Sequence, residues 1–198
     1  MHALPRLIVA TRNAHKTTEI RALAGQWFDV LDVTAFPECP EIPETGTTFL
    51  ENARLKAHGI SRVIDGWVLS DDSGLEVDAL GGAPGVWSSS FGGVEGDHAR
   101  NNTRLLHELH GKTDRAARFR CTMVLARDGL EVANFSGTVE GRILDAARGP
   151  GGFGYDPLFV PDGYDATFSE LGDDVKNSLS HRSRALADAL TYLAEQKF

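Results

Sequence analysis

The sequence is poor in cysteine and has no long apolar run, and each shortage excludes a class of protein. Its two cysteines, Cys39 and Cys121, lie far apart and in no metal-type spacing, so neither a disulfide framework nor a zinc motif is indicated. The segment 1–6 lacks the apolar region of a signal peptide, and the longest apolar run is too short to span a bilayer. We therefore expect a cytoplasmic protein with no membrane partner.

Basic residues are also in deficit. There are 20 Lys and Arg residues against 28 Asp and Glu residues, which gives a formal net charge of −8. A general nucleic-acid binder needs a basic surplus to neutralise backbone phosphates, so we expect no nucleic-acid partner. The negative net charge does not exclude a small anionic ligand that is held by a few local cations and a metal ion.

What is present is typical of a soluble globular protein. The 198 residues are 41% hydrophobic and 24% charged, enough for one domain over 1–198 with a good core, built as one body or as two lobes. Short apolar runs that alternate with helical patterns predict an α/β fold. A predicted hairpin, 119–127 and 130–144 around Asp128-Gly129, indicates a second lobe or an antiparallel extension of the sheet.

Two adjacent acids, Asp71 and Asp72, follow the apolar run 67–69, which predicts the end of a buried strand. We expect Ser73-Gly74 to stop this strand and turn the chain. Ligands of α/β sheets bind outside the carboxyl ends of strands. Neighbouring side chains of a strand point to opposite faces, so the two acids should have different roles. The alternative is a solvated turn.

A second candidate site follows the predicted buried strand 7–10. The loop Thr11–Lys16 leads into a helical pattern, and a loop between a buried strand and a helix start is suited to binding an anion. Thr11 and Asn13 would add hydrogen bonds and Lys16 a full charge. Alternatively, Thr11 and Asn13 cap the helix and Lys16 is solvated.

Further patterns lie downstream. The run 28–33 predicts a strand, Thr48–Glu51 fits a capping box that starts a helix, and 97–110 predicts another helix. Asn52 and Lys56, four residues apart, are predicted to share one face of the first of these helices. Lys56 either is solvated or points into a cleft, and this spacing alone does not decide between the two. In the glycine-rich stretch 149–157, Phe153 can stack on a planar base, or it can plug the core in a plain tight turn.

The last predicted helix carries an apolar stripe and begins near His181 and Arg182. Cations are unfavourable at a helix N-terminus, so these residues indicate an anionic or oxygen-rich partner, unless Arg182 is simply exposed. Cations for phosphates, acids for Mg²⁺ and a ring for a base together predict a nucleoside polyphosphate site. A carboxylate at such a site can also deprotonate the attacking water.

The chain resembles the Ham1/RdgB family of inosine/xanthosine triphosphate pyrophosphatases, through six motifs that run in family order. The matching motifs are Ala10–Asn13 through Lys16, Glu44–Gly46 with Thr48–Ala53 and Lys56-Ala57, Asp71–Leu75, Leu80–Gly85, Gly151–Pro157 and Ser180–Arg182.

This resemblance implies an α/β fold with a long mixed, twisted sheet flanked by helices, two lobes around a central substrate cleft, and a homodimer. It implies Mg²⁺-dependent hydrolysis of inosine, deoxyinosine and xanthosine triphosphates (ITP, dITP, XTP) to the monophosphate and pyrophosphate. Asp72 matches the general base and a metal ligand, and Glu44 a second metal ligand, with Glu41 as a competitor. The matching substrate contacts are Thr11, Arg12, Asn13, Ala14, His15, Lys16, Ser73, Phe153, Gly154, Tyr155, Asp156, Lys176, His181 and Arg182.

Two positions depart from the family pattern. Ser90 stands where an arginine is common, and Val175 where an acid often precedes the lysine. Two other functions also fit the residues: a pyrophosphatase of the Maf type acting on modified pyrimidine nucleotides, and a non-catalytic nucleotide sensor. Guanine shares O6 with inosine and xanthine, so its rejection must come from a contact outside the 6-oxo edge.

Overall fold

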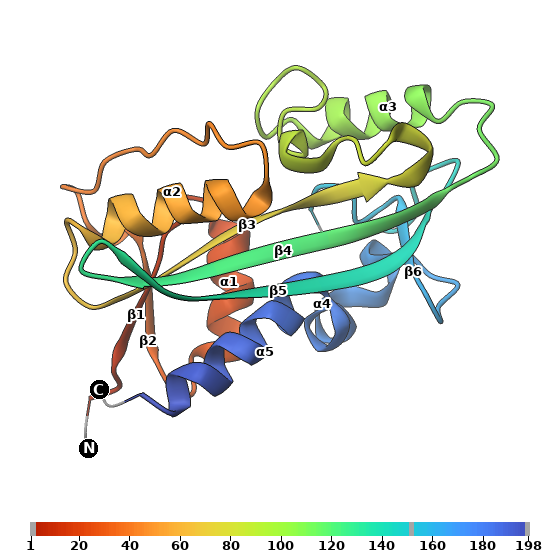
Figure 1. Ribbon diagram of the computed structural model, residues 1–198. Coiled ribbons are helices and arrows are strands. Elements are labelled where there is room, and N and C mark those ends of the chain that lie inside the picture. Colours follow the sequence, from red (N-terminus) through yellow and green to blue (C-terminus); the bar gives the residue numbers. More distant parts are fainter. Residues whose placement is uncertain (1–2, 151–152, 197–198) are drawn as a thin grey trace. The chain divides into compact units, whose positions relative to one another are not determined.

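The computed structural model describes residues 3–150 and 153–196 and shows a mixed α/β fold (Figure 1). Gly151 and Gly152 of the predicted base-binding stretch lie outside the described residues. The six strands are β1 (Arg6–Val9), β2 (Asp29–Asp32), β3 (Trp67–Val77), β4 (Ala116–Arg127), β5 (Leu130–Ile143) and β6 (Phe159–Pro161). The five α-helices are α1 (Ala14–Ala24), α2 (Phe49–Ser61), α3 (His98–Glu108), α4 (Phe168–Leu179) and α5 (His181–Ala194).

The strands form one sheet in the order β2-β1-β3-β4-β5-β6. β1 runs parallel to both β2 and β3, whereas β5 and β6 are antiparallel, so the sheet is mixed as the resemblance implied. The predicted hairpin is confirmed: Asp128 and Gly129 both have positive φ, 54° and 77°, as a tight two-residue turn between twisted strands requires. No helix among the described residues is long and apolar enough to cross a membrane.

The chain divides into two compact units. Unit 1 comprises residues 1–72, 121–137 and 183–198, and unit 2 comprises 73–120 and 138–182. The division falls within strands β3, β4 and β5, each of which contributes to both units. Asp72 is the last residue of the first segment and Ser73 the first of the next, so two candidate site residues are chain neighbours in β3.

In unit 1, helices cover both faces of the sheet (Figure 1). On one face, α1 and α5 bury Ile20, Ala24, Leu186 and other residues against the strands. On the other face, α2 packs Ala53, Ala57 and Ile60 against β1, β3 and β4. The predicted capping box is confirmed, since Thr48 and Glu51 satisfy each other's backbone N–H groups at the start of α2.

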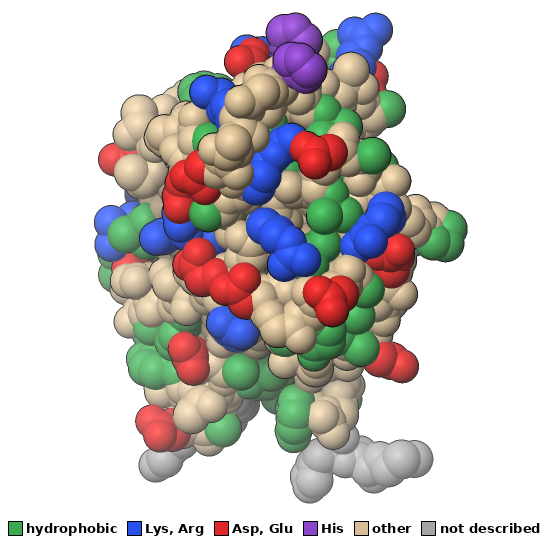
Figure 2. Space-filling view, turned by 90° about the vertical axis from the view of Figure 1, so that its right-hand side faces the viewer, with side chains coloured by type: hydrophobic (Ala, Val, Ile, Leu, Met, Phe, Trp, Pro, Cys, Tyr) green, Lys and Arg blue, Asp and Glu red, His purple; other side chains and the backbone are tan. Residues whose placement is uncertain are grey.

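Unit 2 has its own core of aromatic and aliphatic side chains. Phe119 lies edge-on to Phe159 with ring centroids 4.8 Å apart, and Phe159 stacks on Phe168 at 5.3 Å. Leu105 and Leu109 enter this core from the α3 segment, as their spacing predicted. On the surface of the unit, Arg118 pairs with Asp78 at 2.8 Å and with Glu140 at 2.9 Å. On the face in Figure 2, Lys and Arg side chains are interspersed with Asp and Glu.

Three predictions need correction. The Ser73-Gly74 pair does not stop β3, which continues to Val77 with β4 as its neighbour, although its pairing with β1 ends at Leu69. The strand 28–33 is shorter than expected, because the Asp32 side chain caps a 3₁₀ turn, Val33–Ala35, and accepts from Thr34 N at 3.0 Å. Helix α4 was missed, although Thr167 and Glu170 form a capping box at its start.

Candidate functional site

The predicted anion-binding loop, Thr11–Lys16, is the turn between β1 and α1. Asn13 is the N-cap of α1, and its Oδ1 accepts from the backbone N–H of His15 at 3.0 Å. The Thr11 hydroxyl accepts from the backbone N–H of Asn13 at 3.1 Å. Thr11 and Asn13 therefore do cap the turn, and the cap directs Lys16 toward the sheet while Ala14 and His15 remain exposed.

Arg12 lies in the β1–α1 turn, directly before the N-cap Asn13. Its Nη2 donates to the carbonyl oxygen of Cys39 at 2.9 Å and so ties the β1–α1 turn to the loop that precedes α2. That loop carries Glu44, so this contact links two segments that the sequence assigned to one site.

Lys16 is not solvated. Its Nζ lies 3.1 Å from Oδ1 of Asp71, and its side chain is 14% exposed, whereas the Asp71 side chain is fully buried. The thiol of Cys121 on β4 approaches Oδ2 of the same carboxylate at 3.9 Å. Asp71 thus faces α1 and β4, and a buried acid holds the lysine in place.

Asp72 faces the opposite side of β3, as the alternation of a strand predicts. Its Oδ2 accepts from Nδ2 of Asn52 at 3.2 Å, and its Oδ1 lies 3.5 Å from Nζ of Lys56. Both partners come from α2. These contacts exclude a solvated turn at the two acids, because Asp72 is only 7% exposed.

Lys56 joins two carboxylates. Its Nζ lies 2.7 Å from Oε2 of Glu44 in addition to its contact with Asp72. Lys56 is therefore not solvated: it is buried and paired with acids. Glu41 and Glu44 are both exposed, and it is Glu44 that contacts Lys56.

Together, these residues form a cluster with more acidic than basic side chains. Lys16 and Lys56 face Glu44, Asp71 and Asp72, so the net charge is −1 when all five are ionised. Burial raises the pKa of Asp72 to about 6, although Lys56 and Lys16 pull it down. Burial disfavours the charge of Lys56, but Asp72 and Glu44 outweigh it and raise the pKa of this ammonium group. Asp72 is therefore the member suited to exchanging a proton near neutral pH.

The oxygen donors of Glu44 and Asp72 fit a hard divalent cation. Among residues 3–150 and 153–196, no three His, Cys, Asp or Glu side chains gather as a complete metal site. Mg²⁺ does not need one, because it commonly binds one or two carboxylates and completes its coordination with substrate phosphates and water. Both carboxylates contact the ammonium group of Lys56, so an oxygen of each already faces one common cation.

A second cluster lies in unit 2 and includes the predicted base-binding residues. Oδ2 of Asp156 accepts from the backbone N–H of Phe153 at 2.9 Å and from Nζ of Lys176 at 2.7 Å. Lys176 also lies 4.9 Å from the centroid of the Phe153 ring. Phe153 is half-buried, whereas Tyr155 packs in the core of unit 2, so the alternative in which Phe153 fills the core does not hold.

Helix α3 supports this loop through residues that sequence reasoning missed. Asn102 Nδ2 donates to the carbonyl oxygen of Gly154 at 3.0 Å, and the ring of His98 meets Phe153 edge-on at 5.7 Å. The Tyr155 hydroxyl donates to the carbonyl oxygen of Ser88 at 2.9 Å. Polar residues on an amphipathic helix usually face water, so the sequence carries no signal for these contacts.

The two residues at the start of α5 are both buried. Arg182 is 1% exposed, and its Nη2 donates to Oγ of Ser73 at 2.9 Å, which rules out an exposed surface arginine. The ring of His181 stacks on Phe119 with centroids 5.0 Å apart. The structure thus brings Arg182 together with Ser73, another predicted substrate contact.

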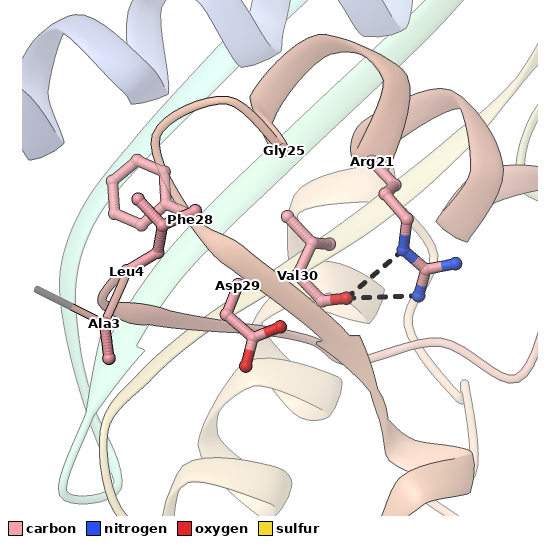
Figure 3. Close-up of a pocket in the computed structure, with 7 residues that line it drawn as sticks. All are labelled: Ala3, Leu4, Arg21, Gly25, Phe28, Asp29 and Val30. Atoms are coloured by element: carbon pink, nitrogen blue, oxygen red, sulfur yellow. Dashed lines mark hydrogen bonds between the residues drawn. The ribbon is translucent and has the colours of Figure 1, made fainter. Parts of the chain in front are cut away.

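A separate cavity of about 410 Å³ lies beside the end of α1 and includes none of the predicted site residues in its lining (Figure 3). Leu4, Phe28 and Val30 supply apolar lining. Arg21 donates through Nε and Nη2 to the carbonyl oxygen of Val30 at 3.3 and 3.1 Å. Because this guanidinium is already engaged and Asp29 adds an acid to the lining, the cavity is poorly suited to a polyphosphate.

The chain is similar to proteins named as dITP/XTP pyrophosphatases. A dITP/XTP pyrophosphatase of Streptococcus pyogenes serotype M3 is 48% identical over 184 residues, which cover 91% of this chain and 56% of that protein. The chain therefore spans about half the length of this relative. A dITP/XTP pyrophosphatase of Geobacter sulfurreducens is 48% identical over 187 residues, which cover 93% of this chain and 94% of that protein.

The fold is also similar to that of solved structures. The structure of a HAM1 protein from Coxiella burnetii superposes with a TM-score of 0.88 at 35% identity, over 98% of this chain and 100% of that one. The model of the Ham1 family matches residues 7–192. The chain therefore belongs to the Ham1 family.

Proposed function

We propose that the protein hydrolyses inosine, deoxyinosine and xanthosine triphosphates to the monophosphate and pyrophosphate, and so removes deaminated purines from the nucleotide pool. The names of the Streptococcus and Geobacter relatives support this substrate class. The observation that carries the proposal is the cluster in which Lys56 bridges exposed Glu44 and buried Asp72 while Lys16 holds buried Asp71. Such a cluster supplies both a general base and cations for a polyphosphate.

In the proposed reaction, Lys16 and the β1–α1 turn bind the phosphate chain. Asp72 accepts a proton from water, the water oxygen attacks the α-phosphorus, and the bond to the bridging oxygen breaks so that pyrophosphate leaves. Glu44 and Asp72 are the residues that would hold Mg²⁺, which when bound neutralises charge on the phosphate oxygens. The raised pKa of Asp72, about 6, suits a base that works near neutral pH.

Base selection is assigned to unit 2. The half-buried ring of Phe153 offers a stacking face, and its loop is fixed by Asp156, Lys176 and Asn102. His181 and Arg182 would direct donors at the 6-oxo group of the purine. Adenine presents an amino donor there, and a desolvated donor left facing it discriminates by on the order of 10⁴.

We propose that residues 1–198 act as one enzyme domain. Strands β3, β4 and β5 support this, because each contributes residues to both units. We also propose a cytoplasmic homodimer with Mg²⁺ as the cofactor. Light scattering of the purified full chain measures the dimer directly, and a monomer at micromolar concentration contradicts it.

A substrate panel tests the proposed function. Purified protein with Mg²⁺ is given inosine, xanthosine, guanosine and adenosine triphosphates and one modified pyrimidine triphosphate, and pyrophosphate release is measured. We expect inosine and xanthosine triphosphates to exceed the other substrates by at least tenfold. Preference for the pyrimidine indicates an enzyme of the Maf type, and binding of inosine triphosphate without release indicates a sensor.

A further inference from the structure

Asn52 is a buried amide that contacts both carboxylate-bearing segments of unit 1. It is 3% exposed and lies one turn before Lys56 on α2. Its Nδ2 donates to Oδ2 of Asp72 at 3.2 Å, and its Oδ1 accepts from the backbone N–H of Gly46 at 2.7 Å. Gly46 is two residues from Glu44, so one side chain connects the loop of one acid with the strand of the other.

The chemistry of both partners fixes the orientation of this amide. A carboxylate only accepts hydrogen bonds and a backbone N–H only donates, so Asp72 must face the NH₂ group and Gly46 the oxygen. Aspartate lacks the donor, leucine lacks both groups, and glutamine is longer by one methylene. Asparagine is thus the residue that satisfies both segments at these distances.

The packing around Gly46 shows how closely the loop approaches α2. A Cβ atom at Gly46 would lie 2.7 Å from Oδ1 of Asn52 and 2.6 Å from Cβ of Glu51. Gly46 does not have a positive φ, so close approach and not backbone conformation is what requires glycine here. The loop is therefore held against Asn52 by contact as well as by its hydrogen bond.

We propose that Asn52 is a positioning residue that sets the spacing between Glu44 and Asp72 and thereby the affinity of their site for Mg²⁺. The inference rests on the proposed function. Asn52 contacts Oδ2 of Asp72, whereas Oδ1 contacts Lys56, which also binds Glu44. Asn52 therefore orients the carboxylate without occupying the oxygen that shares a cation with Glu44. Loss of residues that orient metal ligands typically lowers metal affinity by 10- to 100-fold.

The test compares the full-length wild type with Asn52→Leu, which keeps the branched heavy-atom shape of the side chain and removes both hydrogen bonds. Ser61→Ala is the matched control, because Ser61 is also buried on α2 and its hydroxyl accepts from the backbone N–H of Gly129 at 3.1 Å. Two quantities are measured: the Mg²⁺ concentration that gives half-maximal hydrolysis of saturating inosine triphosphate, and the melting temperature in EDTA and in Mg²⁺.

We expect Asn52→Leu to raise the half-saturating Mg²⁺ concentration by about tenfold or more and to lose the rise in melting temperature that Mg²⁺ gives the wild type. Ser61→Ala should lower the melting temperature in EDTA and leave both Mg²⁺ responses unchanged. If the two variants lose melting temperature alike and keep the wild-type Mg²⁺ responses, Asn52 is purely structural and the inference is wrong.

Gly46→Ala keeps the test decisive if Asn52→Leu does not fold. The added methyl group displaces the loop of Glu44 without altering Asp72, and we expect the same weakening of the Mg²⁺ response. An unchanged response in Gly46→Ala also overturns the inference. A wild type that neither hydrolyses inosine triphosphate nor responds to Mg²⁺ contradicts the proposed function itself, which separates the two failures.

Discussion

Oδ1 of Asp71 and Nζ of Lys16 lie 3.1 Å apart, on the face of β3 opposite to the one that carries Asp72. Each of the two adjacent acids therefore has a lysine of its own, Lys16 from α1 and Lys56 from α2. Lys16 has two tasks as a result: it neutralises a fully buried acid, and in the proposed reaction it contacts the phosphate chain.

Replacing Lys16 by methionine should therefore reduce stability as well as activity. Loss of the cation beside buried Asp71 is expected to lower the free energy of unfolding by about 3 kcal/mol. Adding Asp71→Asn to Lys16→Met should recover part of that stability but none of the activity. Urea denaturation and pyrophosphate release measure the two quantities. If the double variant loses as much stability as the two single variants, Lys16→Met and Asp71→Asn, lose together, Lys16 and Asp71 do not stabilise each other.

The raised pKa of Asp72 predicts how the metal-free protein responds to pH. Burial raises this pKa from 3.8 to about 6, so the folded protein holds the proton more tightly than the unfolded chain. The stabilisation from this group is complete below pH 3.8 and is lost as the pH rises through about 6.

Wild type in EDTA should therefore lose stability relative to Asp72→Asn between about pH 4 and pH 7, by on the order of 3 kcal/mol. Urea denaturation at several pH values measures this difference. Parallel stability profiles for the two proteins would contradict the assigned pKa.

Lys176 should affect binding of the nucleoside and not of the phosphates. It pairs with Asp156 at 2.7 Å, and both side chains are at most 5% exposed. Lys176→Met is expected to loosen the Phe153 loop and raise the KM for inosine triphosphate by about tenfold, on the order of one lost charged hydrogen bond. Inhibition by free pyrophosphate should stay unchanged. Lys112→Met, at an exposed lysine of unit 2, serves as the control and should change neither value.

Arg182 should affect the choice of base. Its guanidinium is buried beside Ser73, and in the proposed site it faces the 6-oxo edge. Arg182→Ala is expected to reduce kcat/KM for inosine triphosphate more than for adenosine triphosphate. Arg184→Ala, an exposed position on α5, is the control. Equal losses for both nucleotides would exclude Arg182 from base selection.

Local signals in the sequence predicted many of the elements correctly. Thr48 and Glu51 marked the start of α2, Asp128-Gly129 marked the hairpin, and the leucines of 97–110 marked the buried side of α3. In each case the sequence signal that predicts the element lies within a few residues. The opposite orientations of Asp71 and Asp72 followed in the same way from the period of a strand.

Predictions failed where distant segments decide the structure. Ser73-Gly74 resembles a turn, but β3 stays extended to Val77 beside β4, a strand that begins only at Ala116. Helix α4 is interrupted at Gly172, with φ 78°, which obscures its helical pattern. Asn52 and Lys56 were placed on one helix face, but the partners of that face lie on β3 and in the loop before α2, and no local pattern names them.

Pyrophosphate release from inosine triphosphate by wild type and by Asp72→Asn, side by side with Mg²⁺, tests the central claim most directly. Wild type should release one pyrophosphate for each inosine monophosphate formed. Asp72→Asn should bind the nucleotide, keep its fold by circular dichroism, and release none. Undiminished release by Asp72→Asn, or no release by the wild type, would contradict the account.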